Sequence, residues 1–119
     1  MNKITLTIPN ISTNRLYTTH RHTGKRILTR QARAIKEAMA WEAKYQYRKP
    51  EIAREFELRI DLYYPDHRRR DGDNIKGLLD AMTGILWKDD SLIVAHMVRK
   101  HVRPGENPRI ELSFPYDLP

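Results

Sequence analysis

The amino-acid sequence predicts a single α+β domain in which two helices pack on a small mixed sheet. Three observations lead to this class. Two segments carry apolar residues at helical spacing, four segments read as strands, and their order is strand, helix, strand, helix, strand, strand. The chain has 119 residues, enough for one modest core, so residues 1–119 are expected to form one domain.

The first predicted strand alternates, with Ile4, Leu6 and Ile8 on one face, and it ends at Pro9. Residues 10–26 have no such period and are rich in Thr, Asn, His and Arg. This composition predicts a long polar loop. A loop of this length in a compact domain is often functional.

A first helix is predicted from residue 29 to about residue 48, with Thr29 as the N-cap and Pro50 as the stop. Its apolar stripe has helical spacing and consists of Ala32, Ile35, Met39, Ala43 and Tyr47. Both tryptophans, Trp41 and Trp87, are expected in the core rather than on the surface as platforms for stacked bases.

The clearest strand spans residues 55–65, where apolar residues recur at every second position. The face predicted to line the core consists of Phe56, Leu58, Ile60, Leu62 and Tyr64. The face predicted to be wet consists of Glu57, Arg59, Asp61 and Tyr63. One side of this strand is therefore expected to pack on the helices and the other to meet solvent.

The second helix is predicted to begin at Asp73 or Asn74, which are both good N-caps. Its continuous apolar face consists of Ile75, Leu78, Leu79, Met82, Ile85 and Leu86. The remaining elements follow in order: a polar turn at 87–90, a β-branched strand at 91–102, a turn at 103–108 and a last strand at 109–114.

The chain is strongly basic, with a formal net charge of +7 and a pI near 9.9. Such a charge favours an anionic partner, either nucleic acid or a membrane surface, although it also serves simple solubility. There is no cysteine, so disulfides and thiolate metal sites are excluded. No apolar run approaches the roughly 20 residues of a membrane helix, and the first residues do not resemble a signal peptide. A cytoplasmic protein is expected.

Two pairs of carboxylates flank the second helix: Asp71 and Asp73 before it, and Asp89 and Asp90 after it. Each has an ordinary explanation, because an Asp at a helix start is usually a cap and two in a turn are usually solvated. Asp71 and Asp73 cannot both be the N-cap, and Gly72 between them indicates special backbone geometry. A helix of about 12 residues spans only ~18 Å, so a folded-back loop would let the pairs meet. Such an all-oxygen site suits Mg²⁺ or Mn²⁺ and not zinc.

Basic residues adjoin the first acidic pair. Arg68, Arg69 and Arg70 either clamp phosphate or neutralise the nearby aspartates. Lys76 lies in the first turn of the predicted helix, where a cation opposes the helix dipole. A structural role for Lys76 would require an i,i+4 ion pair with Asp80, in which the cation precedes the acid, the weaker of the two orders. The five histidines have no convincing metal-ligand spacing.

The segment RRRDGDNIKGLLDAMTGILWKDDSLIV, residues 68–94, resembles the signature of the RusA family of Holliday junction resolvases. The shared pattern is a run of arginines, Asp-x-Asp-Asn, a lysine, an apolar helix with Asp-Ala, and Asp-Asp before a strand. The N-terminal part is also similar, with a strand that ends at Ile-Pro, then STNRLY at 12–17 and a basic RILTR at 26–30. The resemblance covers nearly the whole chain.

The resemblance implies a homodimeric, Mg²⁺-dependent endodeoxyribonuclease that resolves four-way DNA junctions by paired nicks. Asp71, Asp73 and Asp90 would be its catalytic acids and metal ligands, and Lys76 its catalytic lysine. The family pattern has two residues between the asparagine and the lysine, whereas here only Ile75 separates them. One residue rotates a helix by ~100°. Either the loop absorbs the gap or Lys76 points away from the site.

The DNA backbone would be held by the arginine run and the long polar loop. The expected DNA-binding residues are Arg15, Lys25, Arg26, Arg68, Arg69 and Arg70. Two other functions stay open: a nuclease that prefers flaps or other branched DNA, and a catalytically inactive junction-binding protein. The apolar surface left over on the first helix and the C-terminal strands are the candidate dimer interfaces. No membrane partner and no small-molecule cofactor are expected.

Overall fold

A computed structural model describes residues 2–7, 17–19, 26–28, 30–67 and 75–114, and for 17–19 and 26–28 it describes the backbone alone. The elements in chain order are β1 (Asn2–Leu6), β2 (Tyr17–Thr19), β3 (Arg26–Leu28), α1 (Arg30–Gln46), β4 (Phe56–Tyr64), α2 (Ile75–Met82), the short 3₁₀ helix η2 (Asp90–Leu92), β5 (Ile93–Val102) and β6 (Arg109–Phe114). The predicted α+β class and the predicted order of the main elements are confirmed.

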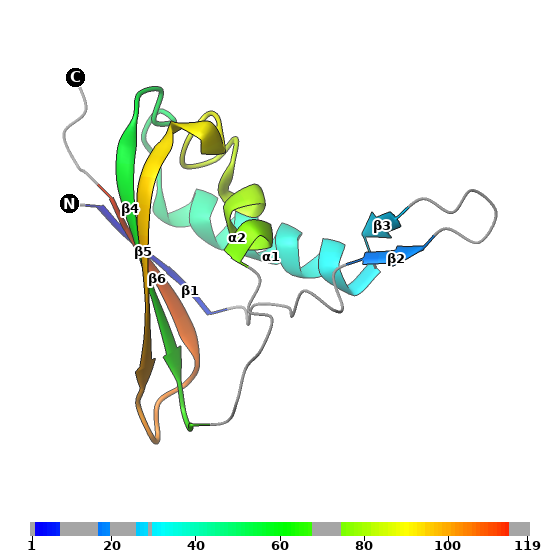
Figure 1. Ribbon diagram of the computed structural model, residues 1–119, viewed down its shortest axis with the longest axis vertical. Helices are drawn as coiled ribbons and strands as arrows, with labels where there is room; N and C mark the ends of the chain where they lie inside the picture. The colour runs from blue at the N-terminus through cyan, green and yellow to red at the C-terminus, as the bar shows by residue number, and fades with distance from the viewer. Residues whose placement is uncertain (1, 8–16, 20–25, 29, 68–74, 115–119) are drawn as a thin grey trace.

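The main sheet has four strands in the order β1-β6-β4-β5. The β4–β5 pair is parallel, and the other two pairs are antiparallel. Both helices lie on one face of this sheet (Figure 1). Strands β2 and β3 form a separate antiparallel hairpin beyond the first turn of α1 (Figure 1). The prediction of a structureless loop at 10–26 is therefore wrong for β2, whose three residues are too few to show a strand period.

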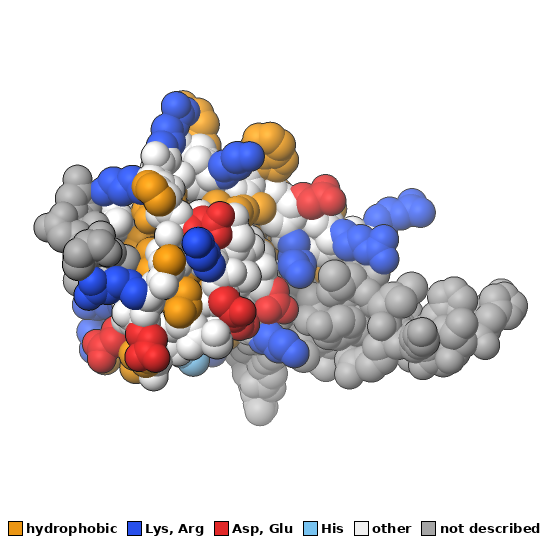
Figure 2. Space-filling view, turned by 90° about the horizontal axis from the view of Figure 1, so that it is seen from above, with side chains coloured by type: hydrophobic (Ala, Val, Ile, Leu, Met, Phe, Trp, Pro, Cys, Tyr) orange, Lys and Arg blue, Asp and Glu red, His pale blue; other side chains and the backbone are white. Residues whose placement is uncertain are grey.

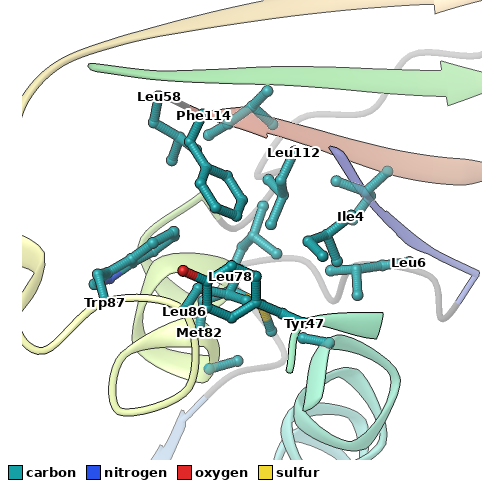
Figure 3. Close-up of a cluster of buried hydrophobic side chains, with 14 of the residues drawn as sticks. Ile4, Leu6, Tyr47, Leu58, Leu78, Met82, Leu86, Trp87, Leu112 and Phe114 are labelled. Carbon is teal, nitrogen blue, oxygen red and sulfur yellow. The ribbon is translucent and has the colours of Figure 1, made fainter. Parts of the chain in front are cut away.

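The core fills the space between the sheet and the two helices (Figure 3). The alternating residues predicted to face inward on the strands are buried: Ile4, Leu6, Phe56, Leu58, Ile60, Leu62, Ile110, Leu112 and Phe114. The helices contribute residues at helical spacing: Ala32, Met39, Ala43, Leu78, Ala81 and Met82. Tyr47 and Phe114 meet edge to face across this core, with ring centroids 5.6 Å apart.

Helix α2 ends at Met82, so the prediction of helix as far as Leu86 is wrong. The Thr83 hydroxyl donates to the Leu79 carbonyl at 2.9 Å, and Gly84 then adopts a φ of +87°. That left-handed conformation favours glycine and lets its N–H donate to the Trp87 carbonyl at 2.7 Å, which closes the turn. Leu86 is still fully buried, so the apolar pattern identified the core face but not the end of the helix.

The two tryptophans have opposite environments. Trp87 is fully buried, as predicted, whereas Trp41 is 71% exposed. Trp41 lies two residues from the buried Met39, which places it roughly 200° around the helix from the core stripe. The prediction that Trp41 is a core residue is therefore wrong. The spacing of the apolar stripe already placed residue 41 on the opposite face of the helix.

The face of the main sheet that carries no helix is not uniformly exposed to solvent. Asp61 on β4 and Glu111 on β6 are only 5% and 7% exposed, although Asp61 was predicted to meet solvent. The two residues are direct cross-strand partners, so two carboxylates lie side by side on the face without helices. Like charges in this arrangement repel each other. Compensating cations are therefore required.

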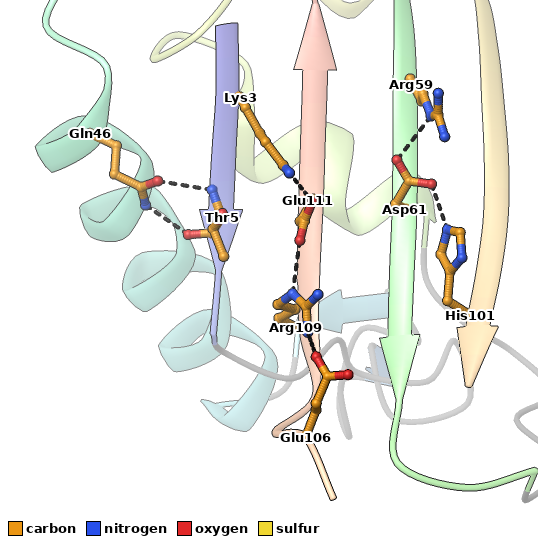
Figure 4. Close-up of polar contacts among 9 residues, drawn as sticks. All are labelled: Lys3, Thr5, Gln46, Arg59, Asp61, His101, Glu106, Arg109 and Glu111. Carbon is orange, nitrogen blue, oxygen red and sulfur yellow. Dashed lines mark hydrogen bonds and ion pairs between the residues drawn. The ribbon is translucent and has the colours of Figure 1, made fainter. Parts of the chain in front are cut away.

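Those cations surround the two acids (Figure 4). Lys3 and Arg109 bind Glu111 at 2.6 and 2.8 Å. Asp61 accepts from Arg59 at 3.0 Å and contacts the His101 ring at 2.7 Å. We name these six residues the charged sheet cluster. Tyr63 covers one side of it, because its ring stacks on His101 at 4.5 Å and lies beneath the Arg109 guanidinium at 3.8 Å.

The cluster depresses the pKa of both acids. Burial by itself raises the pKa of Asp61, but the hydrogen bonds from His101 and Arg59 outweigh burial and leave the pKa below its usual value. Burial likewise raises the pKa of Glu111, and the hydrogen bonds from Lys3 and Arg109 reverse the effect. Both carboxylates are therefore more readily ionised in the folded chain than in the unfolded one.

We expect the free energy of unfolding to fall in acid. A carboxyl whose folded pKa is depressed stabilises the fold above its unfolded pKa, about 4 here, and loses that contribution as pH falls through the folded pKa. Asp61→Asn should cost roughly 1–3 kcal/mol near neutral pH and clearly less near pH ~3. Urea denaturation at both pH values measures this. Glu57→Gln, which alters an exposed acid on the same strand, is the control and should have little effect. An Asp61→Asn penalty that is the same at both pH values would contradict the assignment.

Candidate active site

The turn after α2 carries Asp89 and Asp90, and we call it the acidic turn. It is held in place by the buried Trp87. Its indole N–H donates to the Thr83 hydroxyl at 3.1 Å, and its ring packs on Phe56 with centroids 5.5 Å apart. The backbone on each side of Trp87 pairs with Ile52: the Ile52 N–H donates to the Leu86 carbonyl at 2.9 Å, and the Lys88 N–H donates to the Ile52 carbonyl at 3.0 Å. The next residues therefore leave the core from a fixed point.

Asp89 is the N-cap of η2. Its backbone is extended, with φ −151° and ψ 140°, and its carboxylate accepts the Ser91 N–H at 2.9 Å. This backbone hydrogen bond is the main reason that the pKa of Asp89 is lowered. The sequence left open whether Asp89 is a metal ligand, and the structure gives it a capping role. An Asp two residues before a Ser in a turn is the signal that could have indicated this.

Asp90 is the first residue of η2 and is exposed. It forms no ion pair with any residue that the structure describes. Strand β5 begins three residues later, and its Ile93 pairs with Phe56 at the start of β4. Asp90 thus presents a solvent-facing carboxylate between two anchored segments, Trp87 and β5.

Lys76 is exposed in the first described turn of α2, next to the buried Gly77 and Leu78. It pairs neither with Asp80 nor with any other acid in the described parts of the chain. The structural explanation considered for Lys76, an ion pair along the helix, is therefore absent. That its ammonium faces the predicted acids stays a prediction.

Most of the other predicted site residues lie outside the described ranges: Asp71, Asp73, Arg68, Arg69, Arg70, Arg15 and Lys25. Arg26 is described only by its backbone, as the first residue of β3. Within the described residues, no group of three or more His, Asp or Glu side chains is placed to hold a metal ion. The predicted ligand set therefore has one described member, Asp90.

Among the described residues of the predicted ligand set, Asp90 fits a hard divalent cation. It offers carboxylate oxygens, which are the ligands that Mg²⁺ and Mn²⁺ prefer.

A basic α+β domain that presents a fixed, solvent-facing carboxylate fits an enzyme acting on a polyanion. Comparison with known proteins is more specific, because the family model of endodeoxyribonuclease RusA matches residues 8–114. The chain belongs to this endodeoxyribonuclease family, as the resemblance indicated.

Curated relatives agree over almost the full length. The chain is 31% identical over 116 residues to the crossover junction endodeoxyribonuclease RusA of Escherichia coli (strain K12), which covers 96% of this chain and 95% of the relative. The corresponding proteins of Enterobacteria phage 82 and Shigella sonnei are 31% and 30% identical over the same shares. Among the described residues, no helix is long and apolar enough to cross a membrane.

The neighbouring aspartates of the turn should differ in their effect on stability. Asp89→Ala removes the cap of η2 and should lower the free energy of unfolding, because the Ser91 N–H loses its partner. Asp90→Ala, at the adjacent exposed position, should leave it nearly unchanged. Urea titrations of the two variants and the wild type provide the comparison. Equal losses in both variants would mean that the Ser91 hydrogen bond does not stabilise the turn.

Proposed function

We propose that this chain is a Mg²⁺-dependent endodeoxyribonuclease that resolves four-way DNA junctions by paired symmetric nicks. The observation that carries the proposal is the family match across residues 8–114, which includes both acidic pairs. The names of its relatives, crossover junction endodeoxyribonucleases, give the substrate class. Its net charge of +7 suits a nucleic-acid substrate, and we expect it to act in the cytoplasm, where DNA is present.

The chemistry follows from the residue types. Asp71, Asp73 and Asp90 would hold one or more Mg²⁺ ions, with Mn²⁺ as an alternative. A bound ion supplies an activated water and stabilises charge on the phosphate and the leaving oxygen. The Lys76 ammonium, which no described acid neutralises, would stabilise the same developing charge or orient the water.

Backbone contacts would hold the DNA beside the acids. The residues proposed for this are Arg15, Lys25, Arg26, Arg68, Arg69 and Arg70. Guanidinium groups suit this role because they bind phosphate through two parallel hydrogen bonds. Contacts of this kind position the substrate without reading its sequence.

Asp73→Asn and Asp90→Asn should each abolish cleavage of a synthetic four-way junction while binding stays equal or becomes tighter. Each change removes a ligand charge but keeps the side-chain size, and it leaves the phosphate-binding cations untouched. Cleavage with Mg²⁺ and a mobility-shift titration in EDTA measure the two properties separately. Asp89→Asn is the matched control, since asparagine can also cap η2 and cleavage should persist.

The same substrates separate the rival functions. Mg²⁺-dependent cleavage of flaps in preference to junctions would favour a nuclease for other branched DNA. Junction binding without cleavage under any divalent ion would indicate an inactive binding protein. Loss of binding in step with loss of cleavage in both Asp→Asn variants would show that these aspartates are structural.

We also propose a homodimer, because two symmetric nicks in a nearly two-fold symmetric junction require two equivalent sites. Strand β5 is the better of the two predicted interface regions. It lies at the edge of the main sheet, and it carries three exposed large hydrophobic residues, Val94, Met97 and Val98, beside exposed basic ones. Two β5 strands paired antiparallel about Met97 would set Arg99 opposite Ala95 rather than opposite its own copy.

This dimer can be tested at the centre of the proposed pairing. Met97→Lys would place two ammonium groups opposite each other and should weaken dimerisation at least about tenfold, or ~1.4 kcal/mol. Sedimentation equilibrium at micromolar protein measures it. Trp41→Lys, which alters an exposed apolar residue of α1, is the control and should remain dimeric. A wild type that is strictly monomeric yet cuts both strands in one encounter would exclude the dimer.

A further inference from the structure

An apolar hollow of about 490 Å³ opens between α1 and the turn after α2. Its walls include Trp41 from α1, Tyr47 just after that helix, Pro50, and Gly84 with Ile85. The hollow is preformed, because the Tyr47 hydroxyl donates to the Pro50 carbonyl at 2.9 Å and the Gly84 N–H is bonded to Trp87. A volume of this size falls within the range of small-molecule sites.

The rim of the hollow combines an exposed aromatic ring with basic groups. Trp41 is 71% exposed, and the Lys44 ammonium lies 5.5 Å from its ring centroid. One turn further on, Tyr45 is 75% exposed, and the Arg48 guanidinium lies 5.3 Å from its ring. In Figure 2, exposed hydrophobic side chains lie beside Lys and Arg along the upper border of the molecule. Trp41 differs from Tyr45 in that its ring also lines the hollow, and apolar surface beside a groove marks a binding site more often than a single exposed ring does.

From this arrangement we propose that the hollow binds an unpaired nucleobase of DNA, which stacks on Trp41 while Lys44 contacts the adjoining phosphate. Base stacking on aromatic side chains combined with a basic rim is how proteins hold single-stranded nucleic acid. Two acids also line the hollow, Glu37 and Glu51. Carboxylates there can accept hydrogen bonds from the ring N–H of thymine or the amino groups of other bases, whereas a second phosphate would be repelled. The hollow is therefore a base site rather than a second site for the backbone.

The hollow is linked to the acidic turn through the chain itself. Its Gly84 and Ile85 wall lies in the same turn as Trp87, and Ile52, two residues after Pro50, pairs with the backbone on both sides of Trp87. The base site and Asp90 are therefore anchored to the same buried residue. The inference rests on the proposed function, because it requires that a base at the branch point of the bound DNA leaves its pair and enters the hollow.

The test uses oligothymidylate in EDTA, so that binding is measured without cleavage. The affinity of every variant is measured by fluorescence anisotropy of an end-labelled oligomer. In the wild type, quenching of tryptophan fluorescence by the bases should in addition report Trp41, since Trp87 is fully buried. Trp41→Ala should weaken oligothymidylate binding by roughly five- to a hundredfold, which is the contribution of one base–aromatic stack. Trp41→Phe should retain part of the wild-type affinity, because phenylalanine keeps an aromatic ring. An abasic oligomer with the same phosphates should bind wild type and Trp41→Ala equally.

Tyr45→Ala is the matched control. It removes an equally exposed aromatic ring from the same helix, but Tyr45 does not line the hollow, so affinity should change by no more than about twofold. Equal losses in Trp41→Ala and Tyr45→Ala would overturn the base site in favour of a general basic surface. A shift of Trp41→Ala from dimer to monomer would overturn it in favour of a contact between copies.

The failure of the base site and that of the proposed function give different results. Unchanged oligothymidylate affinity in Trp41→Ala, together with normal Mg²⁺-dependent junction cleavage by the wild type, would remove only the base site. A wild type that neither binds nor cleaves any branched DNA would remove the proposed function, and the base site with it.

Discussion

The position of the acidic turn depends on one buried indole. Trp87 lies where the end of α2, the segment before β4 and the lead-in to β5 meet, and the backbone on both sides of it pairs with Ile52. The burial of so large a side chain contributes several kcal/mol, because replacing a core tryptophan by alanine typically costs about 3–5 kcal/mol. Asp89 and Asp90 follow within three residues, so the core fixes the origin of a turn that is itself exposed.

The charged sheet cluster explains why the second sheet face has no helix. Asp61 and Glu111 are nearly buried without a covering layer, because the side chains of Lys3, Arg59 and Arg109 and their neighbours fold over them. Packing an apolar layer on this face would desolvate those cations, and partners for their remaining donors would be needed. Association through the edge of the sheet avoids that cost, which favours β5 over the sheet face as the contact in the proposed dimer.

The sequence predicted the elements whose periodicity is strong and local. The stripe in α1 and the alternation in β4 are set by burial on one side. The stripe is confirmed, and the alternation is confirmed from Phe56 to Ile60. The end of α2 was missed because apolar spacing continues through Ile85 and Leu86 although the backbone has already turned at Gly84. Burial of Asp61 depends on Arg59 and His101, and the latter lies 40 residues away in the chain. No local pattern carries that information.

The candidate site shows the same division between local and long-range information. The resemblance assigned a catalytic role to Asp90 and left open whether Asp89 is also a metal ligand. One backbone hydrogen bond separates the two residues, because it makes Asp89 the cap of η2 while Asp90 is exposed. The exposed Trp41 was assigned to the core because tryptophan is usually buried, although its helical phase already placed it opposite Met39. Its exposure matters because the hollow beside it shares a wall with the Trp87 turn. Both the acidic turn and the hollow are anchored to Trp87 in the core, so a change in the packing of Trp87 would alter the two together.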